Sequence, residues 1–475
     1  MKKGSMMVLA GLCGLLSHAA GTPLTPFGRY VVAVESDTAK DAGWEKVVTA
    51  LRVKYRAKVL NYTAGELDAL LPELRKAAPR YVCFVTKPEH AGRDLIVGAA
   101  QTLRKIDDDP YGDALWGVVT GYDAEDALRM VSNPKPMEIE RIATSMGNPN
   151  CLNEWKGGFA SNEANQHEFW SKKPGAAETT AERVEPDPAE ALAKAFNEIP
   201  VDYWMTSGHA SERDWQIIYN KNAGSLKHKD GELFFTSPSG KRYPMASKSP
   251  KVYIAAGNCL IGNIDKRDCM ATAWMHTGGV SQMLGYTVPT FYGFMGWGTK
   301  SLFEAGRHSV AESYFLNNQI LLWILGRSNS DLRDSAIDPK GSFDTRAFFR
   351  TLGGKIHSQD DAGLIWDRDT VAFYGDPAWR VTYPEKRRDI DIQLEKNTIT
   401  LRFLRDVTFP DHIDIKGTRP VGVLLNTPPP KDARLVDAAT GEPVPDAVVT
   451  ELFALIPLTG RQEQGKVLRF ALKAR

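Results

Sequence analysis

The chain has 475 residues, which suits two to four domains of about 100–200 residues each, and an apolar fraction of 43% that can fill a sizeable core. It carries 59 Lys and Arg against 58 Asp and Glu, so it has neither the basic excess that favours nucleic-acid binding nor an acidic tail. Beyond the N-terminus, no apolar run approaches the ~20 residues that span a bilayer.

The first residues have the pattern of an export signal. Lys2 and Lys3 form a short positive region, "MMVLAGLCGLL" (6–16) is an apolar core, and "SHAAG" supplies small residues for cleavage. We therefore expect residues 1–20 to be a signal peptide and the mature protein to be periplasmic, on the cell surface or extracellular. A membrane anchor is the alternative, which the shortness of the apolar run disfavours.

Residues 25–135 alternate strand-like and helix-like segments. "RYVVAVES", "KVLNY", "RYVCFVT" and "ALWGVVTG" are short apolar runs, and a segment with helical spacing of apolar residues follows each of them. This alternation is typical of a parallel sheet covered by helices on both faces. We expect a first α/β subdomain here.

Residues 136–385 are expected to form a second α/β subdomain, which carries the candidate catalytic residues. Residues 132–186 are rich in Asn, Pro, Gly and Lys, and 172–188 has the pattern of an exposed connection. This stretch is either a long functional loop or contains elements that the sequence does not resolve. Further on, "VDYWMTS" and "KVYIAAGN" are predicted strands, and a polar, hairpin-like insertion without a helix separates them. Residues 301–325 have the spacing of one long helix.

The character of the chain changes near residue 386. "DIDIQLEKNTITLRFLRD" alternates apolar and polar residues with period two, and later segments repeat this pattern between Pro and Gly turns. Short strands at regular intervals without helices indicate an all-β sandwich over residues 386–475.

Four cysteines follow the signal: Cys83, Cys151, Cys259 and Cys269. They are too sparse for a disulfide scaffold, and no Cys or His spacing matches a zinc site, so no metal ligands are assigned. Cys83 lies inside an apolar run and is predicted to be a small buried hydrophobe. A disulfide of Cys151 stays open, because its partner is not evident from the sequence.

Two of the predicted strand ends carry reactive side chains: Cys259 in "AAGNCLIG" and His209 in "TSGHAS". If the two strands are neighbours in one sheet, thiol and imidazole meet at the same edge. A cysteine attacks as the thiolate and needs such a base, and the N–H groups of Cys259 and Ala210 are candidate donors to an oxyanion. The alternative is a cysteine and a histidine that only pack.

These motifs, in this order, resemble the gingipain family of the caspase–gingipain clan of cysteine peptidases. The clan's caspases also have the histidine about 50 residues before the cysteine. The segments "GNCLIGNID" and 273–293 are similar to the family's sequence after its nucleophile. "YGDPAWRV" (374–381) looks like its closing motif before an immunoglobulin-like domain, and 107–127 resembles its acidic stretch.

The resemblance implies a two-part caspase/gingipain-like parallel-sheet region followed by an all-β immunoglobulin-like sandwich. It implies an exported cysteine endopeptidase, a hydrolase that cleaves proteins or peptides after basic residues through a thioester acyl-enzyme. Cys259 matches the nucleophile and His209 the general base and acid, whereas Ala210 stands where the family usually has glycine. The chemistry needs no cofactor, and a structural calcium ion is compatible with the family.

Further site residues follow from the same comparison. Asp113, in the acidic stretch, is the candidate acid that orients the histidine, and a solvated or calcium-binding loop aspartate is the alternative. Tyr286, Phe291, Tyr292 and Trp297 are candidates for a substrate pocket, with packing under the C-terminal domain as the alternative. Two other functions stay open: a non-catalytic binding module on the same scaffold, and an α/β ligand-binding protein with a cleft between its two α/β units.

Overall fold

The structure is a computed structural model that describes residues 29–133, 135–183, 187–217, 223–247, 249–338, 344–410 and 419–474. The predicted signal peptide, residues 1–20, lies outside the described residues. Among the helices that are described, none is both long and apolar enough to cross a membrane.

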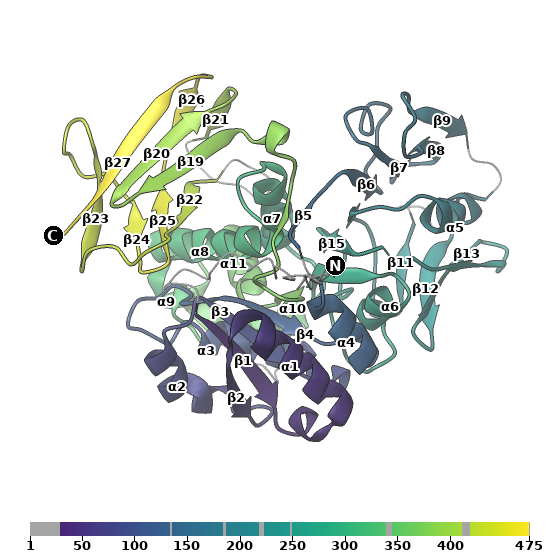
Figure 1. The fold of residues 1–475 in the computed structure, drawn as a ribbon, viewed down its shortest axis with the longest axis horizontal. Coiled ribbons are helices and arrows are strands. Elements are labelled where there is room, and N and C mark those ends of the chain that lie inside the picture. Colours follow the sequence, from purple (N-terminus) through teal and green to yellow (C-terminus); the bar gives the residue numbers. More distant parts are fainter. Residues whose placement is uncertain are drawn as a thin grey trace, which may run out of the picture.

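One twelve-stranded, mostly parallel sheet runs through the α/β region in the order β2-β1-β3-β4-β17-β16-β15-β10-β6-β7-β8-β9 (Figure 1). Strands β2 to β17 are parallel to one another, and so are β16 to β7, but the pair β16–β17 is antiparallel. The expected two-part parallel region is therefore one sheet whose halves run in opposite directions. In sheet order the strands are Lys58–Tyr62, Tyr30–Glu35, Tyr81–Val85, Leu115–Val119, Val371–Tyr374, Val280–Tyr286, Lys251–Ala255, Tyr203–Thr206, Arg141–Thr144, Gly157–Asn162, Asn165–Lys172 and Thr180–Arg183.

Helices cover both faces of the first half, as the alternating pattern predicts. Successive residues of a strand point to opposite faces, so Val32 and Cys83 pack with α1 and α4, whereas Val31 and Phe84 pack with α2 and α3. Cys83 is fully buried, which confirms its packing role. The four helices are α1 (Ala42–Tyr55), α2 (Leu71–Ala77), α3 (Arg93–Thr102) and α4 (Ala124–Val131).

The second half contains strands that the sequence did not predict. The stretch rich in Asn, Pro, Gly and Lys supplies β6 to β9, and Phe159 in β7 and Phe169 and Trp170 in β8 are buried. The expected hairpin-like insertion is a four-stranded antiparallel sheet, β11 to β14, between β10 and β15. Its strands and the flanking helices are β11 (Asp214–Gln216), β12 (Ser225–Lys229), β13 (Glu232–Thr236), β14 (Arg242–Met245), α5 (Pro188–Glu198) and α6 (Met270–His276).

The prediction of one helix over residues 301–325 was wrong. The chain forms α7 (Phe294–Glu304) and α8 (Val310–Ser328), separated by a turn at Gly306, whose φ is 72°. Ser309 and Glu312 cap the start of α8 reciprocally, which fixes the new helix after the turn. Three helices that the sequence did not predict follow: α9 (Ser330–Arg333), α10 (Thr345–Leu352) and α11 (Gln359–Arg368).

The C-terminal residues form strands, as predicted. One core fills the space between a four-stranded sheet, β19-β20-β27-β23, and a three-stranded sheet, β22-β25-β24, while the immunoglobulin-like topology stays a prediction. The ring of Phe453 lies 5.7 Å from that of Phe315, so these strands rest on α8 (Figure 1). The strands are β19 (Ile390–Glu395), β20 (Thr398–Phe403), β21 (Val407–Phe409), β22 (Val421–Leu424), β23 (Ala433–Asp437), β24 (Val448–Val449), β25 (Phe453–Ile456), β26 (Gly460–Gln462) and β27 (Val467–Ala474).

The remaining short elements connect these parts. They are the strand pair β5 (Met137–Glu138) and β18 (Val381–Thr382), and the 3-10 turns Thr38–Lys40, Leu67–Leu70, Pro88–His90, Gly353–Lys355 and Glu385–Arg387.

Candidate active site

Cys259 and His209 follow two strands that pair directly. β10 and β15 are parallel, and their last residues, Thr206 and Ala255, are partners in the register. His209 comes three residues after β10 and Cys259 four residues after β15. The two loops therefore leave the same edge of the sheet side by side, as the sequence predicted for this pair of strands.

The side chain of Asn258 joins these two loops. It is fully buried; its Oδ1 accepts a hydrogen bond from the Thr206 hydroxyl at 2.6 Å, and its Nδ2 donates to the Gly208 carbonyl at 3.0 Å. Gly208 has a φ of 98°, which favours glycine. The residue before the cysteine is thus bonded to the residue before the histidine. Sequence reasoning missed Asn258, although a polar residue directly after an apolar strand was the available signal.

The thiol of Cys259 is partly exposed, and its Sγ accepts a hydrogen bond from the Thr290 N–H at 3.3 Å. Leu260 follows in the left-handed region, with a φ of 57°, and donates its N–H to Val288. A non-glycine residue with positive φ costs about 1–3 kcal/mol and is found preferentially at functional turns. The turn that presents the sulfur is therefore held in a strained shape by its hydrogen bonds.

The other described cysteines lie in different surroundings. Cys83 and Cys269 are fully buried, and burial raises the pKa of both thiols; burial also raises the pKa of the partly exposed Cys151. All four are free, so Cys151 forms no disulfide with another described cysteine.

The two predicted oxyanion donors are the backbone N–H groups of Ala210 and Cys259. Ala210 forms an isolated bridge with Trp215, but the hydrogen bonds of this bridge run from Ser211 to Asp214 and from Gln216 to His209. Within the described part of the chain, no hydrogen bond uses the N–H of Ala210 or that of Cys259. Both N–H groups are therefore available to an incoming acceptor.

A small polar cavity of about 240 Å³ lies beside the exposed His209. Asp214 also lines it, and the Oδ1 of this residue accepts a hydrogen bond from the Ser211 hydroxyl at 2.6 Å. The indole N–H of buried Trp215 donates to the Ser207 carbonyl at 2.9 Å, which fixes the start of the histidine loop. The lining residues are His209, Ala210, Asp214, Gln216, Gly224 and Ser225.

The structure does not bring Asp113 to the histidine. Asp113 precedes β4, which is four strands away from β10 across the sheet. At the usual spacing this separation is about 19 Å. The carboxylate instead accepts hydrogen bonds from the N–H groups of Ile106 and Asp107 in its own loop.

Asp113 belongs to a cluster of three carboxylates. One oxygen each of Asp107, Asp109 and Asp113 lies within 4.8 Å of the others. Burial, together with the charges of Asp107 and Asp109, raises the pKa of Asp113 to about 9. Hard oxygen ligands of this kind fit a calcium ion, which would relieve the repulsion.

The predicted pocket aromatics separate into two groups. Tyr286 is fully buried and donates its hydroxyl to Asp367, so it lines no accessible pocket. Phe291 is 44% exposed, and Tyr292 and Trp297 are partly exposed. Trp297 lies against Gly257, two residues before the nucleophile.

A larger cavity of about 740 Å³ lies between the first half of the α/β region and the loop after the cysteine. The first half contributes Tyr62, Arg93 and Gln101, among other residues. The loop contributes the segment 263–265. Arg93 also joins the first half of the α/β region to the end of β16 in the second half, because its guanidinium donates to the Thr287 carbonyl at 2.6 and 2.9 Å.

No known protein family matches this sequence, and no curated protein matches it. Among solved structures, the Arg-specific cysteine proteinase gingipain R is similar at 11% identity, over 92% of this chain and 94% of that chain, with a TM-score of 0.41. A second structure, described only as a protease, is similar at 10% identity, over 94% and 98% of the two chains, with a TM-score of 0.36. Both similarities extend over more than nine tenths of each chain, at a sequence identity of 11% or 10%.

Proposed function

We propose that this protein is an exported cysteine endopeptidase in which Cys259 is the nucleophile and His209 the general base and acid. The observation that carries the proposal is the pairing of β10 with β15, together with the Asn258 side chain that bonds the two loops to each other. Adjoining, hydrogen-bonded loops support the proposal, because covalent catalysis requires a nucleophile and its base within hydrogen-bond reach of each other.

In the proposed reaction, His209 takes the thiol proton and the Cys259 sulfur attacks the scissile carbonyl carbon. The N–H groups of Cys259 and Ala210 donate to the oxyanion of the tetrahedral intermediate. The intermediate then expels the amine, which takes the proton from His209, and leaves a thioester. His209 then deprotonates a water molecule, whose oxygen attacks the thioester carbonyl carbon. The C–S bond breaks, the acyl group leaves as the carboxylic acid, and His209 returns the proton to the Cys259 thiolate.

The resemblance to gingipains adds two finer points to the proposal. The first is cleavage after basic residues, for which the Asp214 carboxylate in the cavity beside His209 would supply a complementary charge. The second is a structural calcium ion on the cluster of Asp107, Asp109 and Asp113.

Thiol labelling combined with a peptide panel tests the proposal. Iodoacetamide at neutral pH should label Cys259 faster than Cys151, the other partly exposed cysteine. Peptides that vary in the residue before the cleaved bond should be hydrolysed by the wild type and by Cys151→Ala, but not by Cys259→Ala. Equal labelling of both thiols and no turnover, even after limited proteolysis, would favour a non-catalytic binding module.

A second candidate function is ligand binding between the two halves of the α/β region. The cavity of about 740 Å³ favours it, since small-molecule pockets usually measure about 300–1,000 Å³. In that case a small-molecule thermal-shift screen should yield ligands that stabilise wild type and Cys259→Ala equally, and Arg93→Gln should weaken their binding.

A further inference from the structure

The loop from Val288 to Gly293 presents an exposed phenylalanine beside the candidate nucleophile. We propose that Phe291 and Phe349 form an apolar subsite that receives a large apolar side chain of the substrate, close to the bond that Cys259 attacks. This inference rests on the proposed peptidase function and adds to it a second determinant of specificity.

Phe291 is close to the reacting sulfur along the chain. The N–H of Thr290 donates to Cys259 Sγ at 3.3 Å, and Phe291 is the next residue. Phe291 therefore directly follows the residue whose N–H contacts the sulfur, on the loop beside the candidate nucleophile.

Contacts with α11 hold the loop on both sides of Phe291. The indole N–H of Trp366 donates to the Pro289 carbonyl at 2.8 Å, and the Tyr292 hydroxyl donates to Asp360 at 2.7 Å. Gly363 makes the second contact possible, because a Cβ at this position would lie 2.2 Å from the Tyr292 ring. Phe291 is thus anchored at both neighbours while its own ring projects outward.

The projecting ring forms one apolar surface with α10. Phe291 is 44% exposed, and its ring centroid lies 5.5 Å from that of the partly buried Phe349 at an interplanar angle of 62°. Phe349 in turn packs on fully buried Trp366, with centroids 5.9 Å apart. Aromatic surface left in water on a rigid support is a feature of binding sites, since burying it in a complex is favourable.

Position in the molecule distinguishes Phe291 from other exposed apolar residues. Among described residues, two other large apolar side chains are exposed: Val53 on α1 at 71% and Leu404 in the C-terminal strands at 38%. Neither is near Cys259 in the sequence or in the sheet. Phe291 directly follows Thr290, which donates a hydrogen bond to the candidate nucleophile, and its ring also packs against Phe349 of α10.

The test uses peptides with Arg directly before the cleaved bond. They carry either Leu or Ser at the position before that Arg, or at the first or second position after the bond. We expect the wild type to prefer Leu at one of these positions. Phe291→Ala and Phe349→Ala should each lower the Leu-to-Ser ratio of kcat/KM about tenfold or more, the range for a large apolar group in a pocket. Leu404→Ala is the matched control and should keep the wild-type ratio.

Phe349→Leu is a second variant that keeps most of the packing on Trp366, in case the alanine variant does not fold; it should lower the ratio less. Turnover with the wild-type ratio in both Phe291→Ala and Phe349→Leu would overturn the subsite and leave the peptidase proposal intact. No turnover by the wild type, with no preferential labelling of Cys259, would overturn the peptidase proposal and the subsite together.

Discussion

The side-chain Nδ2 of Asn258 donates to the Gly208 carbonyl at 3.0 Å, so one buried amide ties the loop of the candidate nucleophile to that of its base. Replacing Asn258 by Ala leaves the Thr206 hydroxyl and the Gly208 carbonyl without this partner. We expect the free energy of unfolding to fall by about 1–3 kcal/mol. We also expect slower iodoacetamide labelling of Cys259, because the two loops lose their fixed separation.

Urea unfolding and labelling kinetics measure the two effects. Thr206→Val is the matched control, since it removes the hydroxyl's hydrogen bonds to Asn258 Oδ1 and to the Tyr253 hydroxyl but leaves the bond between Asn258 and Gly208. If iodoacetamide labels Cys259 as fast in Asn258→Ala as in Thr206→Val, the Asn258 amide has a structural role alone.

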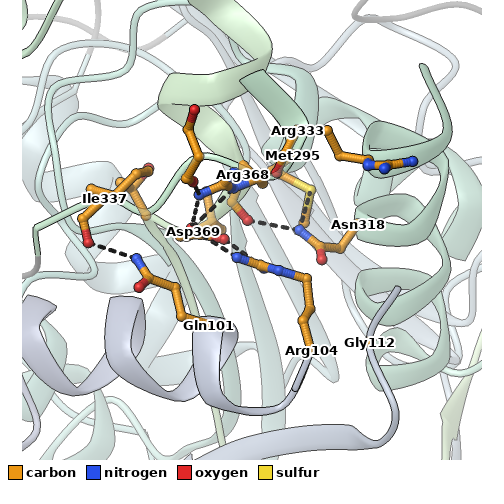
Figure 2. A network of polar contacts seen from close by, with 12 residues as sticks. Gln101, Arg104, Gly112, Met295, Asn318, Arg333, Ile337, Arg368 and Asp369 are labelled. Carbon is orange, nitrogen blue, oxygen red and sulfur yellow. Dashed lines mark hydrogen bonds and ion pairs between the residues drawn. The ribbon is translucent and has the colours of Figure 1, made fainter. Parts of the chain in front are cut away.

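A buried carboxylate, Asp369, joins the first half of the α/β region to α11 (Figure 2). Its oxygens contact Arg104 at 2.7 Å and Arg368 at 2.7 Å. Burial opposes its ionisation, but the two guanidinium groups outweigh burial and lower the pKa of Asp369 to about 2. The ion pairs therefore stabilise the fold above about pH 4. This stability is lost as the pH falls through about 2.

Asp369→Asn should lower the free energy of unfolding by about 3–5 kcal/mol at neutral pH, because two arginines then lack their buried counter-charge. The control is Asp334→Asn, which breaks the pair between Arg333 and a carboxylate that is 55% exposed. Exposed pairs contribute about 0–1 kcal/mol. Equal losses in the two variants would contradict the role assigned to burial.

The sequence predicted those parts of the fold whose residues show a local pattern. The strands at Tyr30–Glu35, Tyr81–Val85 and Lys251–Ala255 are continuous apolar runs because both faces of the sheet are covered. By contrast, β8 reads "NQHEFWSK" and shows no such run. It lies near the end of the sheet, where polar side chains are tolerated, so the sequence resembled a loop.

Other misses arise from partners that are far apart in the sequence. The position of Asp376, between Gly375 and Pro377, indicates a turn residue, yet its buried carboxylate also accepts hydrogen bonds from the hydroxyls of Tyr30 and Tyr55. Likewise, the glycines of "GFMGWG" (293–298) disfavour a helix. Gly296 lies inside α7, where a Cβ would come within 2.0 Å of the Ala256 carbonyl. Only the packed structure explains these residues.

The part of the candidate site that local patterns encode was also predicted. Two apolar runs, each followed by a reactive side chain, predicted that Cys259 and His209 follow neighbouring strands at one edge of the sheet. Asn258, α10 and the distance of Asp113 from the histidine depend on tertiary contacts and strand order, which no local pattern encodes.

The carboxyl group of Asp367 should make stability depend on pH near neutrality. It is fully buried, accepts hydrogen bonds from the Tyr286 hydroxyl and the Met295 N–H, and burial raises its pKa to about 7. In the unfolded chain the pKa is about 3.9. Between about pH 4 and 7 the folded protein retains a proton that the unfolded chain has lost, so stability falls as pH rises through this window.

The variant Asp367→Asn has no carboxyl proton at this position, so its stability should lack the pH dependence that Asp367 causes. We expect the free energy of unfolding of the wild type, relative to the variant, to fall by up to about 1.4 kcal/mol for each pH unit in the window. Outside the window the difference should be constant. Urea titrations at half-unit pH steps measure it, and a difference independent of pH would contradict a buried neutral carboxyl group.

Calcium should stabilise the protein through Asp107, Asp109 and Asp113. The three carboxylates converge within 4.8 Å, so a divalent cation would replace their mutual repulsion by attraction. At a calcium concentration 100 times the Kd, the free energy of unfolding should rise by about 2.7 kcal/mol. A scan of Tm in calcium and in chelator measures this rise.

Asp109→Asn should remove most of the rise, whereas Asp108→Asn, which changes a neighbouring aspartate outside the cluster, should keep it. A Tm that ignores calcium, or a rise that survives in Asp109→Asn, would show that the cluster does not bind the ion.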